Sequence, residues 1–289
     1  MFDHAKFLEY LTAYKNSFKD RWEKEKFKWV AVKHFQQYWD VDAPDFLNMV
    51  MEATKKTGSL LNSGNTFKLG MLLDFIKVEP EAVRQMFLDL YNENINLETR
   101  IHQFILSSEN LWEKYKENKQ WKNHFQDTNS VAIYLWLRYP DKYYIYKYRE
   151  CLSICEALSS DFRPKANGKA NNVLGAFNIY DEISSALRAD PTILSLLQSS
   201  ITIDCYVDKS LHTLTIDFGR FITQLKNQTK EKTETEEGNE TWFPSLETYN
   251  PGLTKENWLG LLHDPEVFKP SSLEIMKRML DFGGQATCK

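Results

Sequence analysis

The chain has 289 residues, of which 42% are hydrophobic and 26% charged, and its net charge is −4. This length predicts one large or two ordinary domains, and the composition is typical of a globular protein rather than a disordered or fibrous one. An acidic total excludes a general nucleic-acid binder, so any site for an anion must be a local patch.

The N-terminal region predicts a series of helices. From residue 3 to about residue 118, apolar residues recur every three or four positions, as at Phe7, Leu11 and Tyr14. We expect Asp42 to cap a helix that has Pro44 in its first turn. The helices are expected at about 3–20, 27–38, 42–58, 64–79, 80–94 and 96–119.

The period changes near residue 130. "SVAIYLWLRYP" and "KYYIYKY" are rich in β-branched and aromatic residues, and "RYPDK" between them is typical of a turn, so we expect a β-hairpin. Helices are expected again at about 149–160 and at 173–201, with a break at Asp190–Pro191. A short strand near 211–217 is expected to run into a closing helix. The predicted fold class is α+β, predominantly helical with a small antiparallel, aromatic-rich sheet.

The clearest boundary in the chain is residues 226–241, which contain no apolar residue. Such a segment buries too little surface to offset its ordering entropy, so it predicts a flexible acidic linker. Residues 1–225 would then form one recognition domain. Residues 242–289 are expected to hold two short helices, capped by Thr254 and by Ser271 or Ser272, that begin a further domain. We expect the natural protein to continue beyond Lys289.

The tyrosine-rich segment carries the candidate binding residues. Aromatic rings stack on bases for about 1–3 kcal/mol each in single-strand binders, and they can line a pocket for an extruded base. Residues 130–170 hold seven basic and four acidic side chains, an excess of positive charge that suits a phosphate backbone. Core packing of the rings is the alternative, because aromatic residues pack well in strands. The predicted nucleic-acid-binding residues are Tyr134, Trp136, Arg138, Lys142, Tyr144, Tyr146, Lys147 and Arg149.

A second basic stretch runs from Lys15 to Lys33, with seven basic and three acidic residues. A solvated helix face is the simpler interpretation, and contact with DNA phosphates is the alternative.

The sequence offers no catalytic or metal site. Its six histidines lack ligand spacing, no GxSxG motif occurs, and "IDCYVDK" does not complete a PD-(D/E)xK nuclease motif. The four cysteines, at positions 151, 155, 205 and 288, form no CxxC pair, so we expect reduced core thiols and a cytoplasmic protein. The N-terminus lacks a signal-peptide pattern, and no apolar run approaches the roughly 18 residues of a membrane span.

Several long strings resemble the N-terminal region of McrB-type AAA+ restriction proteins. They lie at residues 34–64, 71–93, 130–148, 213–219 and 249–288. The resemblance implies a target-recognition module for DNA that can carry a modified, for example methylated, base. It also implies a downstream motor that uses GTP or ATP with magnesium, oligomers that form through that motor, and an McrC-type nuclease subunit as partner.

The chain departs from the family pattern at the motor. The phosphate-binding motif GxxxxGK[ST] would need a glycine at Arg163 and a hydroxyl at Ala170, around the single Gly168–Lys169 pair. We therefore expect no nucleotide cofactor in this chain. A DNA-recognition module is the first hypothesis, and a protein-interaction or assembly scaffold of the same type of defence system is the alternative. The sequence shows no set of catalytic residues that would indicate an independent enzyme.

Overall fold

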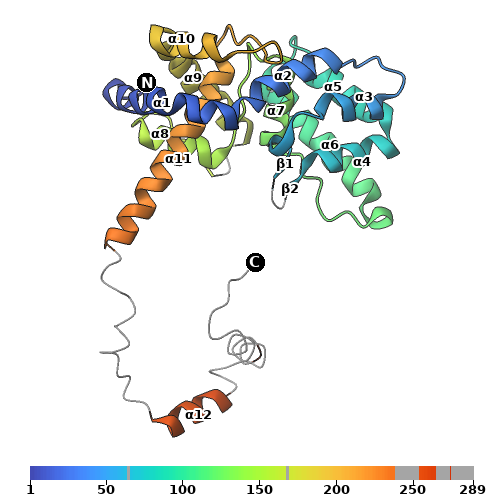
Figure 1. The fold of residues 1–289 in the computed structure, drawn as a ribbon. Helices are drawn as coiled ribbons and strands as arrows, with labels where there is room; N and C mark the ends of the chain where they lie inside the picture. The colour runs from blue at the N-terminus through green and yellow to red at the C-terminus, as the bar shows by residue number, and fades with distance from the viewer. Residues whose placement is uncertain (64–65, 167–168, 238–253, 265–273, 275–289) are drawn as a thin grey trace. The chain divides into compact units, whose positions relative to one another are not determined.

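The computed structural model describes residues 1–63, 66–166, 169–237, 254–264 and 274 (Figure 1). Its chain divides into two compact units, Met1–Lys230 and Glu231–Lys289. The described part is mostly helical. None of the helices described combines the length and hydropathy needed to cross a membrane.

The first half of the larger unit consists of short and medium helices. Asp3 begins the first of them, because its carboxylate accepts hydrogen bonds from the backbone N–H groups of Ala5 and Lys6. The cap of the third helix is Asp45, which accepts from the N–H of Asn48, and not Asp42 as predicted. The elements are α1 (His4–Glu25), α2 (Phe27–Tyr38), α3 (Phe46–Thr54), η1 (Gly58–Leu60), β1 (Asn62–Ser63), β2 (Thr66–Phe67), α4 (Lys68–Val78), α5 (Pro80–Tyr91) and α6 (Leu97–Lys119).

The second half continues with α7 (Thr128–Arg138), α8 (Tyr148–Ala157), α9 (Lys169–Arg188), α10 (Pro191–Ser200) and α11 (His212–Glu237). Within this unit, α1, α8, α9, α10 and α11 lie at one end and α3, α4, α5 and α6 at the other, with α2 and α7 between them (Figure 1). The smaller unit has α12 (Lys255–His263), which is capped by the Thr254 hydroxyl, as predicted.

The predicted aromatic hairpin is wrong. Residues 128–138 form α7, which begins with a capping box between Asp127 and Ser130. Every residue from Ser130 to Leu137 is buried, so this helix is apolar on all sides and lacks the one-sided pattern of a surface helix. Residues 139–147 form a turn and an extended connection without a ladder partner.

The strand expected near 211–217 is also wrong, because α11 begins at His212. The buried carboxylate of Asp208 accepts from the N–H groups of Thr213 and Leu214 and so holds the first turn of α11. In the part of the chain that the structure describes, the strands are the two-residue pair β1 and β2, which are antiparallel. The predicted α+β class is therefore corrected to a helical fold.

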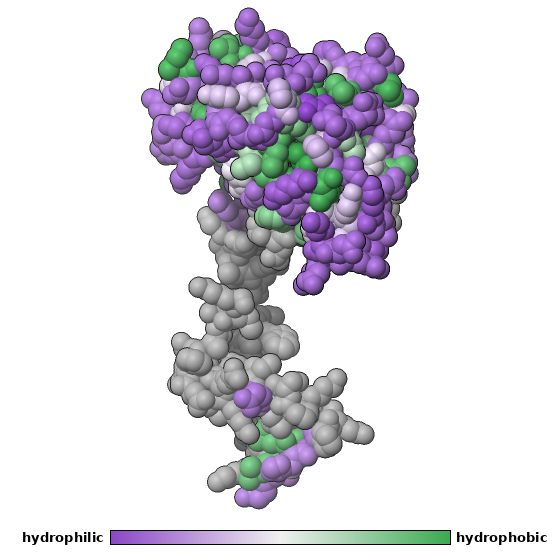
Figure 2. Space-filling model, turned by 90° about the vertical axis from the view of Figure 1, so that its right-hand side faces the viewer, coloured by the Kyte–Doolittle hydropathy of each residue, from purple (hydrophilic) through white to green (hydrophobic). Residues whose placement is uncertain are grey.

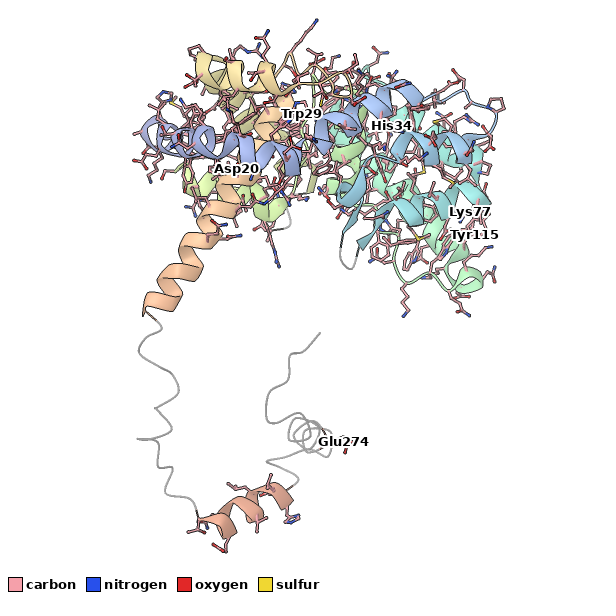
Figure 3. All side chains as sticks on the ribbon, viewed as in Figure 1. Asp20, Trp29, His34, Lys77, Tyr115 and Glu274 are labelled. Atoms are coloured by element: carbon pink, nitrogen blue, oxygen red, sulfur yellow. The ribbon has the colours of Figure 1, made fainter. Side chains whose placement is uncertain are left out.

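The core is dominated by aromatic side chains. α7 lies at its centre and contacts α2, α5, α6 and α9. Trp29, labelled in Figure 3, is fully buried on α2. The surface is largely hydrophilic in the view of Figure 2, where hydrophobic residues gather near the centre of the larger unit. Cys151, Cys155 and Cys205 are buried free thiols, and position 288 lies outside the described residues.

A buried ionic network joins α1, α2 and α11. Asp217 accepts hydrogen bonds from the Tyr14 hydroxyl at 2.7 Å, from Arg21 at 2.9 Å and from Lys28 at 2.5 Å. Burial raises the pKa of Asp217, but the nearby Lys28 and Arg21 more than offset this and lower it to about 2. The carboxylate is therefore ionised at neutral pH and fixes α11 to both N-terminal helices.

Most cations of the second basic stretch, Lys15 to Lys33, form ion pairs or hydrogen bonds within the protein. Lys15 pairs with Asp190, Lys26 with Glu23 and Lys28 with Glu25, and Lys33 donates to a backbone carbonyl. With Arg21, five of its seven cations are engaged within the protein. Contact with DNA phosphates through this stretch would therefore rest on Lys19 and Lys24 alone.

The segment predicted as a linker is helical where it is described. α11 continues to Glu237, and residues 238–241 lie outside the described residues. Apart from Glu274, the second helix expected in residues 242–289 also lies outside them.

Candidate functional site

Four of the predicted binding residues are aromatic, and all four are buried. Tyr134, Trp136, Tyr144 and Tyr146 are 1%, 0%, 0% and 2% exposed. The Tyr134 hydroxyl donates to Gln126, the Trp136 indole to Thr213 and the Tyr144 hydroxyl to Asp181. These rings would have to leave the core to stack on a base, so the open aromatic surface expected from the sequence is not present.

The four predicted cations have different environments. Arg138 is half-buried over the ring of Tyr139, and Lys142 is paired with Glu93. Lys147 is half-buried, and burial lowers its pKa. Arg149 is exposed and makes no ion pair with any described residue. Of the eight predicted residues, the four aromatic ones are therefore in the core, and Lys142 and Arg149 are exposed.

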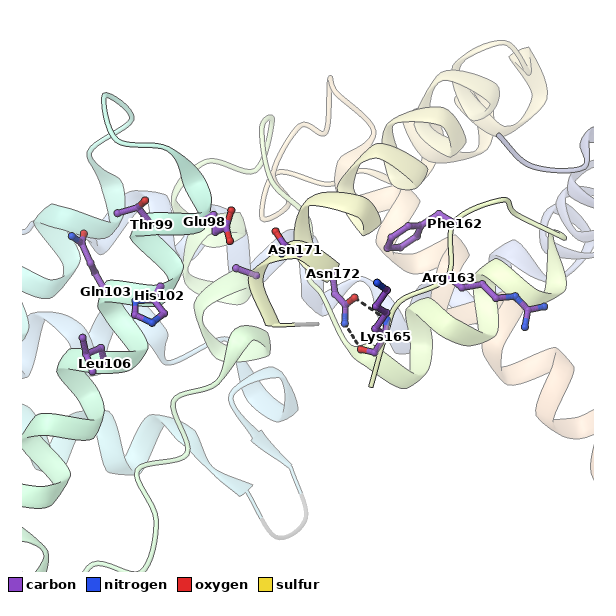
Figure 4. Close-up of a pocket in the computed structure, with 11 residues that line it drawn as sticks. Glu98, Thr99, His102, Gln103, Leu106, Phe162, Arg163, Lys165, Asn171 and Asn172 are labelled. Atoms are coloured by element: carbon purple, nitrogen blue, oxygen red, sulfur yellow. Dashed lines mark hydrogen bonds between the residues drawn. The ribbon is translucent and has the colours of Figure 1, made fainter. Parts of the chain in front are cut away.

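A groove lies instead along α6. Its first hollow has a volume of about 840 Å³ and its second about 590 Å³, and the two share His102, Leu106, Ala170 and Asn172. We call this continuous feature the α6 groove. One wall is α6, and the other is formed by Phe162–Lys165 and the start of α9 (Figure 4). Its size is that of a small-molecule site.

The helical wall follows from the spacing of its residues. Glu98, His102, Ile105 and Glu109 are three or four positions apart, so they share one face of α6. Leu106 adds an exposed apolar side chain, 49% accessible. This wall is therefore apolar along its middle and acidic at Glu98 and Glu109.

The opposite wall depends on close packing against α9. The ring of Phe162 lies on Gly175, where an added Cβ atom would come within 2.1 Å of it. Asn172 fixes the segment, because its amide donates to the carbonyl of Lys165 at 2.6 Å and accepts from the N–H of Lys165 at 2.9 Å (Figure 4). The backbone of this wall is thus held in place by side chains of α9.

Two exposed cations belong to this wall. Arg163 and Lys165 make no ion pair with any residue that the structure describes. Figure 4 shows the guanidinium of Arg163 extending away from α6. The groove is therefore basic on the side of α9 and acidic on the side of α6.

Tyr146 is the one predicted residue that lines the groove. It contributes to the second hollow, and its hydroxyl oxygen is buried beside the side chain of Asn172. Burial raises its pKa to about 12, so the hydroxyl keeps its proton at neutral pH. Its backbone carbonyl accepts from Asn129, which also accepts from the buried Lys68.

Two histidines also line the second hollow. The Nδ1 atom of His124 accepts from the N–H of Gln126, which places the proton of the neutral ring on Nε2, 4.0 Å from Glu109. Burial lowers the pKa of His124, so the ring is neutral near pH 7. Among the residues described, no group of three or more His, Cys, Asp or Glu is arranged to hold a metal ion.

Two cations of the groove lie within the basic segment that the sequence singled out, although they are not among the eight predicted residues. Arg163 and Lys165 are two of the basic residues counted in 130–170, and the composition of "RPKANGKANN" predicts a polar loop. The residues of α6 that form the other wall carry no sequence signal of their own, because their spacing is that of any amphipathic helix.

Comparison of the chain with protein-family models, with curated proteins and with solved structures gives no match.

Proposed function

We propose that the larger unit is the DNA-recognition module of an McrB-like restriction protein of the cytoplasm, and that it binds without making or breaking bonds. The observation that supports this best is the α6 groove. It brings the rings of Tyr148 and Phe162 together with the unpaired cations Arg163 and Lys165 at an accessible surface. Rings beside cations are the combination that holds single-stranded nucleic acid and extruded bases.

The charges of the groove give the proposed complex an orientation. Phosphates would follow the side of Arg163 and Lys165, because Glu98 and Glu109 repel them from the wall of α6. A base, modified or not, would then face the apolar middle of the groove. Phosphate contacts supply affinity, and the fit of the base supplies selectivity.

The larger assembly is proposed from the resemblance alone. A downstream motor would use GTP or ATP with magnesium, form the oligomer and recruit an McrC-type nuclease. The larger unit would recognise the target DNA for this assembly.

A salt titration tests the proposal. Binding to duplex, single-stranded and methylated DNA is measured by fluorescence anisotropy across a range of salt concentrations. For two neutralised phosphates, the logarithm of the binding constant should fall against the logarithm of salt with a slope of about −1.4 for single strands and about −1.8 for duplex. Failure to bind any of the three DNAs at low salt would refute it.

Two observations favour the scaffold alternative. Five cations of the second basic stretch are engaged internally, and the wall of α6 is acidic, which suits a basic protein segment. The variant Glu98→Lys separates the two proposals, since Glu98 is exposed and lines the groove. DNA recognition predicts several-fold tighter DNA binding in this variant, because a repulsive charge becomes attractive. A scaffold predicts that the variant and the wild type both fail to bind DNA.

A further inference from the structure

The geometry points to Glu109 and His124 as the pair that binds the edge of a nucleobase in the second hollow of the α6 groove. This inference rests on the proposed function for its link to DNA. It adds the position of the base and the pattern that the edge of the base must carry, an N–H donor beside an acceptor.

The second hollow differs in charge from the first. Arg163 and Lys165 line the first hollow, whereas the described residues that line the second include no lysine or arginine. Its charged groups are the carboxylates of Glu109 and Asp127. A phosphate is therefore disfavoured in the second hollow, and an uncharged group that can donate hydrogen bonds is favoured.

The rest of the second hollow suits a flat ring. Ile101, Ile105 and Leu106 give it an apolar side, and the ring of Tyr148 is half-buried at its edge. Its volume of about 590 Å³ is enough for one base. Apolar and aromatic side chains of this kind hold an extruded base by stacking, while hydrogen bonds to its edge identify it.

Glu109 supplies an acceptor that the fold leaves open. Its side chain is 53% exposed, and the charged group nearest to it in the described part of the chain is Nε2 of His124, at 4.0 Å. This distance is too long for a hydrogen bond. Asp127 is less available, because its carboxylate already accepts from Lys68 and from the N–H of Ser130.

His124 supplies a donor whose direction is fixed. Its Nδ1 accepts from the N–H of Gln126 at 3.1 Å, so the neutral ring carries its proton on Nε2. Gln126 is itself held in place, because its side-chain amide donates to the carbonyl of Lys68 and accepts from the Tyr134 hydroxyl. Nε2 makes no hydrogen bond to any described residue, so this donor is free to meet a ligand.

The backbone beside His124 gives independent support. Phe125 has a φ of 55°, in the left-handed region that residues other than glycine rarely adopt. The side chain of Asn123 accepts from the N–H of Phe125 and stabilises this conformation. Strained backbone of this kind persists where surrounding contacts fix it, and it is concentrated at binding and catalytic sites. Here it lies between His124 and Gln126, the two residues that set the direction of the donor.

The pair places an acceptor and a donor side by side. Adenine matches this pattern, because its amino group can donate to Glu109 while its ring nitrogen N1 accepts from Nε2 of His124. In a duplex both of these atoms are paired with the opposite strand. The pair therefore selects a base that is single-stranded or extruded.

Calorimetric titration of the full chain tests the pair with two probes, 2′-deoxyadenosine and purine 2′-deoxyriboside, which lacks the amino group. We expect deoxyadenosine to bind about tenfold more tightly, the effect of one hydrogen bond to a charged group. Glu109→Ala should lose this preference, and Glu109→Gln, which keeps an acceptor oxygen, should retain part of it. His124→Phe should weaken both nucleosides several-fold, because N1 is present in both.

Glu117→Ala is the matched control, because Glu117, like Lys119, is exposed on α6 outside the lining of the groove. It should leave both affinities unchanged. The pair would be overturned by equal wild-type affinities, by no binding of either nucleoside, by an unchanged preference in Glu109→Ala, or by unchanged affinities in His124→Phe. If single-stranded DNA still binds in any of these cases, the proposed function survives. If the nucleosides follow the expected pattern while DNA does not bind, the pair stands and the proposed function fails.

Discussion

Phe162 can form a wall of the α6 groove because residue 175 has no side chain. The ring occupies the space that a Cβ atom would need, and Gly175 is within α9, where glycine otherwise weakens a helix. The glycine is therefore best explained by this contact. It links one residue of the sequence directly to the shape of the candidate site.

The variant Gly175→Val tests this contact. Its side chain would displace Phe162 and narrow or close the first hollow, and overpacking of this kind costs about 1–3 kcal/mol of unfolding free energy. We expect weaker DNA binding together with a lower midpoint in urea. Gly260→Ala in α12 is the control, because no atom lies within 4 Å of an added Cβ there. A wild-type affinity in Gly175→Val would contradict the assigned wall.

Asp217 shows how a single buried charge sets the pH dependence of stability. Its folded pKa of about 2 lies below the value of 3.8 for an unperturbed aspartate. The ionised group therefore stabilises the fold above the unfolded pKa, and this contribution is lost as the pH falls from about 4 to 2. The difference corresponds to about 2 kcal/mol at neutral pH.

Asp217→Asn should remove this dependence and leave Lys28 and Arg21 with a weaker partner, at a cost of about 3–5 kcal/mol at pH 7. Urea unfolding at pH 7 and pH 3 measures both effects. The variant should lose less stability than the wild type between the two pH values. Asp20→Asn, an exposed change on α1, serves as control (Figure 3). Equal pH profiles for Asp217→Asn and the wild type would show that the network is not ionised as described.

At the scale of the element, the apolar period of 3.6 residues predicted the helices from α1 to α6, since each has one buried face. The same reasoning failed at α7. Its residues are buried on every side, so no period is visible, and their β-branched and aromatic composition favoured a strand. Burial of α7 between α2, α5, α6 and α9 overrides that preference. Contacts between segments far apart in the chain cannot be deduced from the local composition of one sequence.

The start of α7 provides a test at this scale. Asp127 caps the helix through the N–H of Ser130 and pairs with the buried Lys68 at 2.9 Å. Asp127→Ala should cost about 1–2 kcal/mol, because it removes the cap and one partner of Lys68. Urea unfolding measures the loss, and Asp127→Asn, which keeps a capping oxygen, should recover much of it. No loss in the alanine variant would mean that other contacts alone define the helix start.

For the whole molecule, the sequence anticipated a mainly helical first part and aromatic side chains close to cations. It did not anticipate that the tyrosines would fill the core while Arg163 and Lys165 belong to the wall of a groove. Aromatic side chains bury a large apolar area and make favourable contacts with one another, so a segment rich in tyrosine tends to pack into the core. The site then arises where α6 meets the wall of Phe162–Lys165 and α9, segments far apart in the chain, and this pairing is a product of the fold.

The central claim is that the α6 groove binds DNA through the side of Lys165. The most direct measurement is the salt dependence of single-stranded DNA binding for the wild type, Lys165→Glu and the control Lys119→Glu. Loss of one phosphate contact predicts that the magnitude of the slope falls by about 0.7 in Lys165→Glu, with weaker binding at every salt concentration, while the control keeps the wild-type slope. Identical slopes and affinities in all three proteins would contradict the claim.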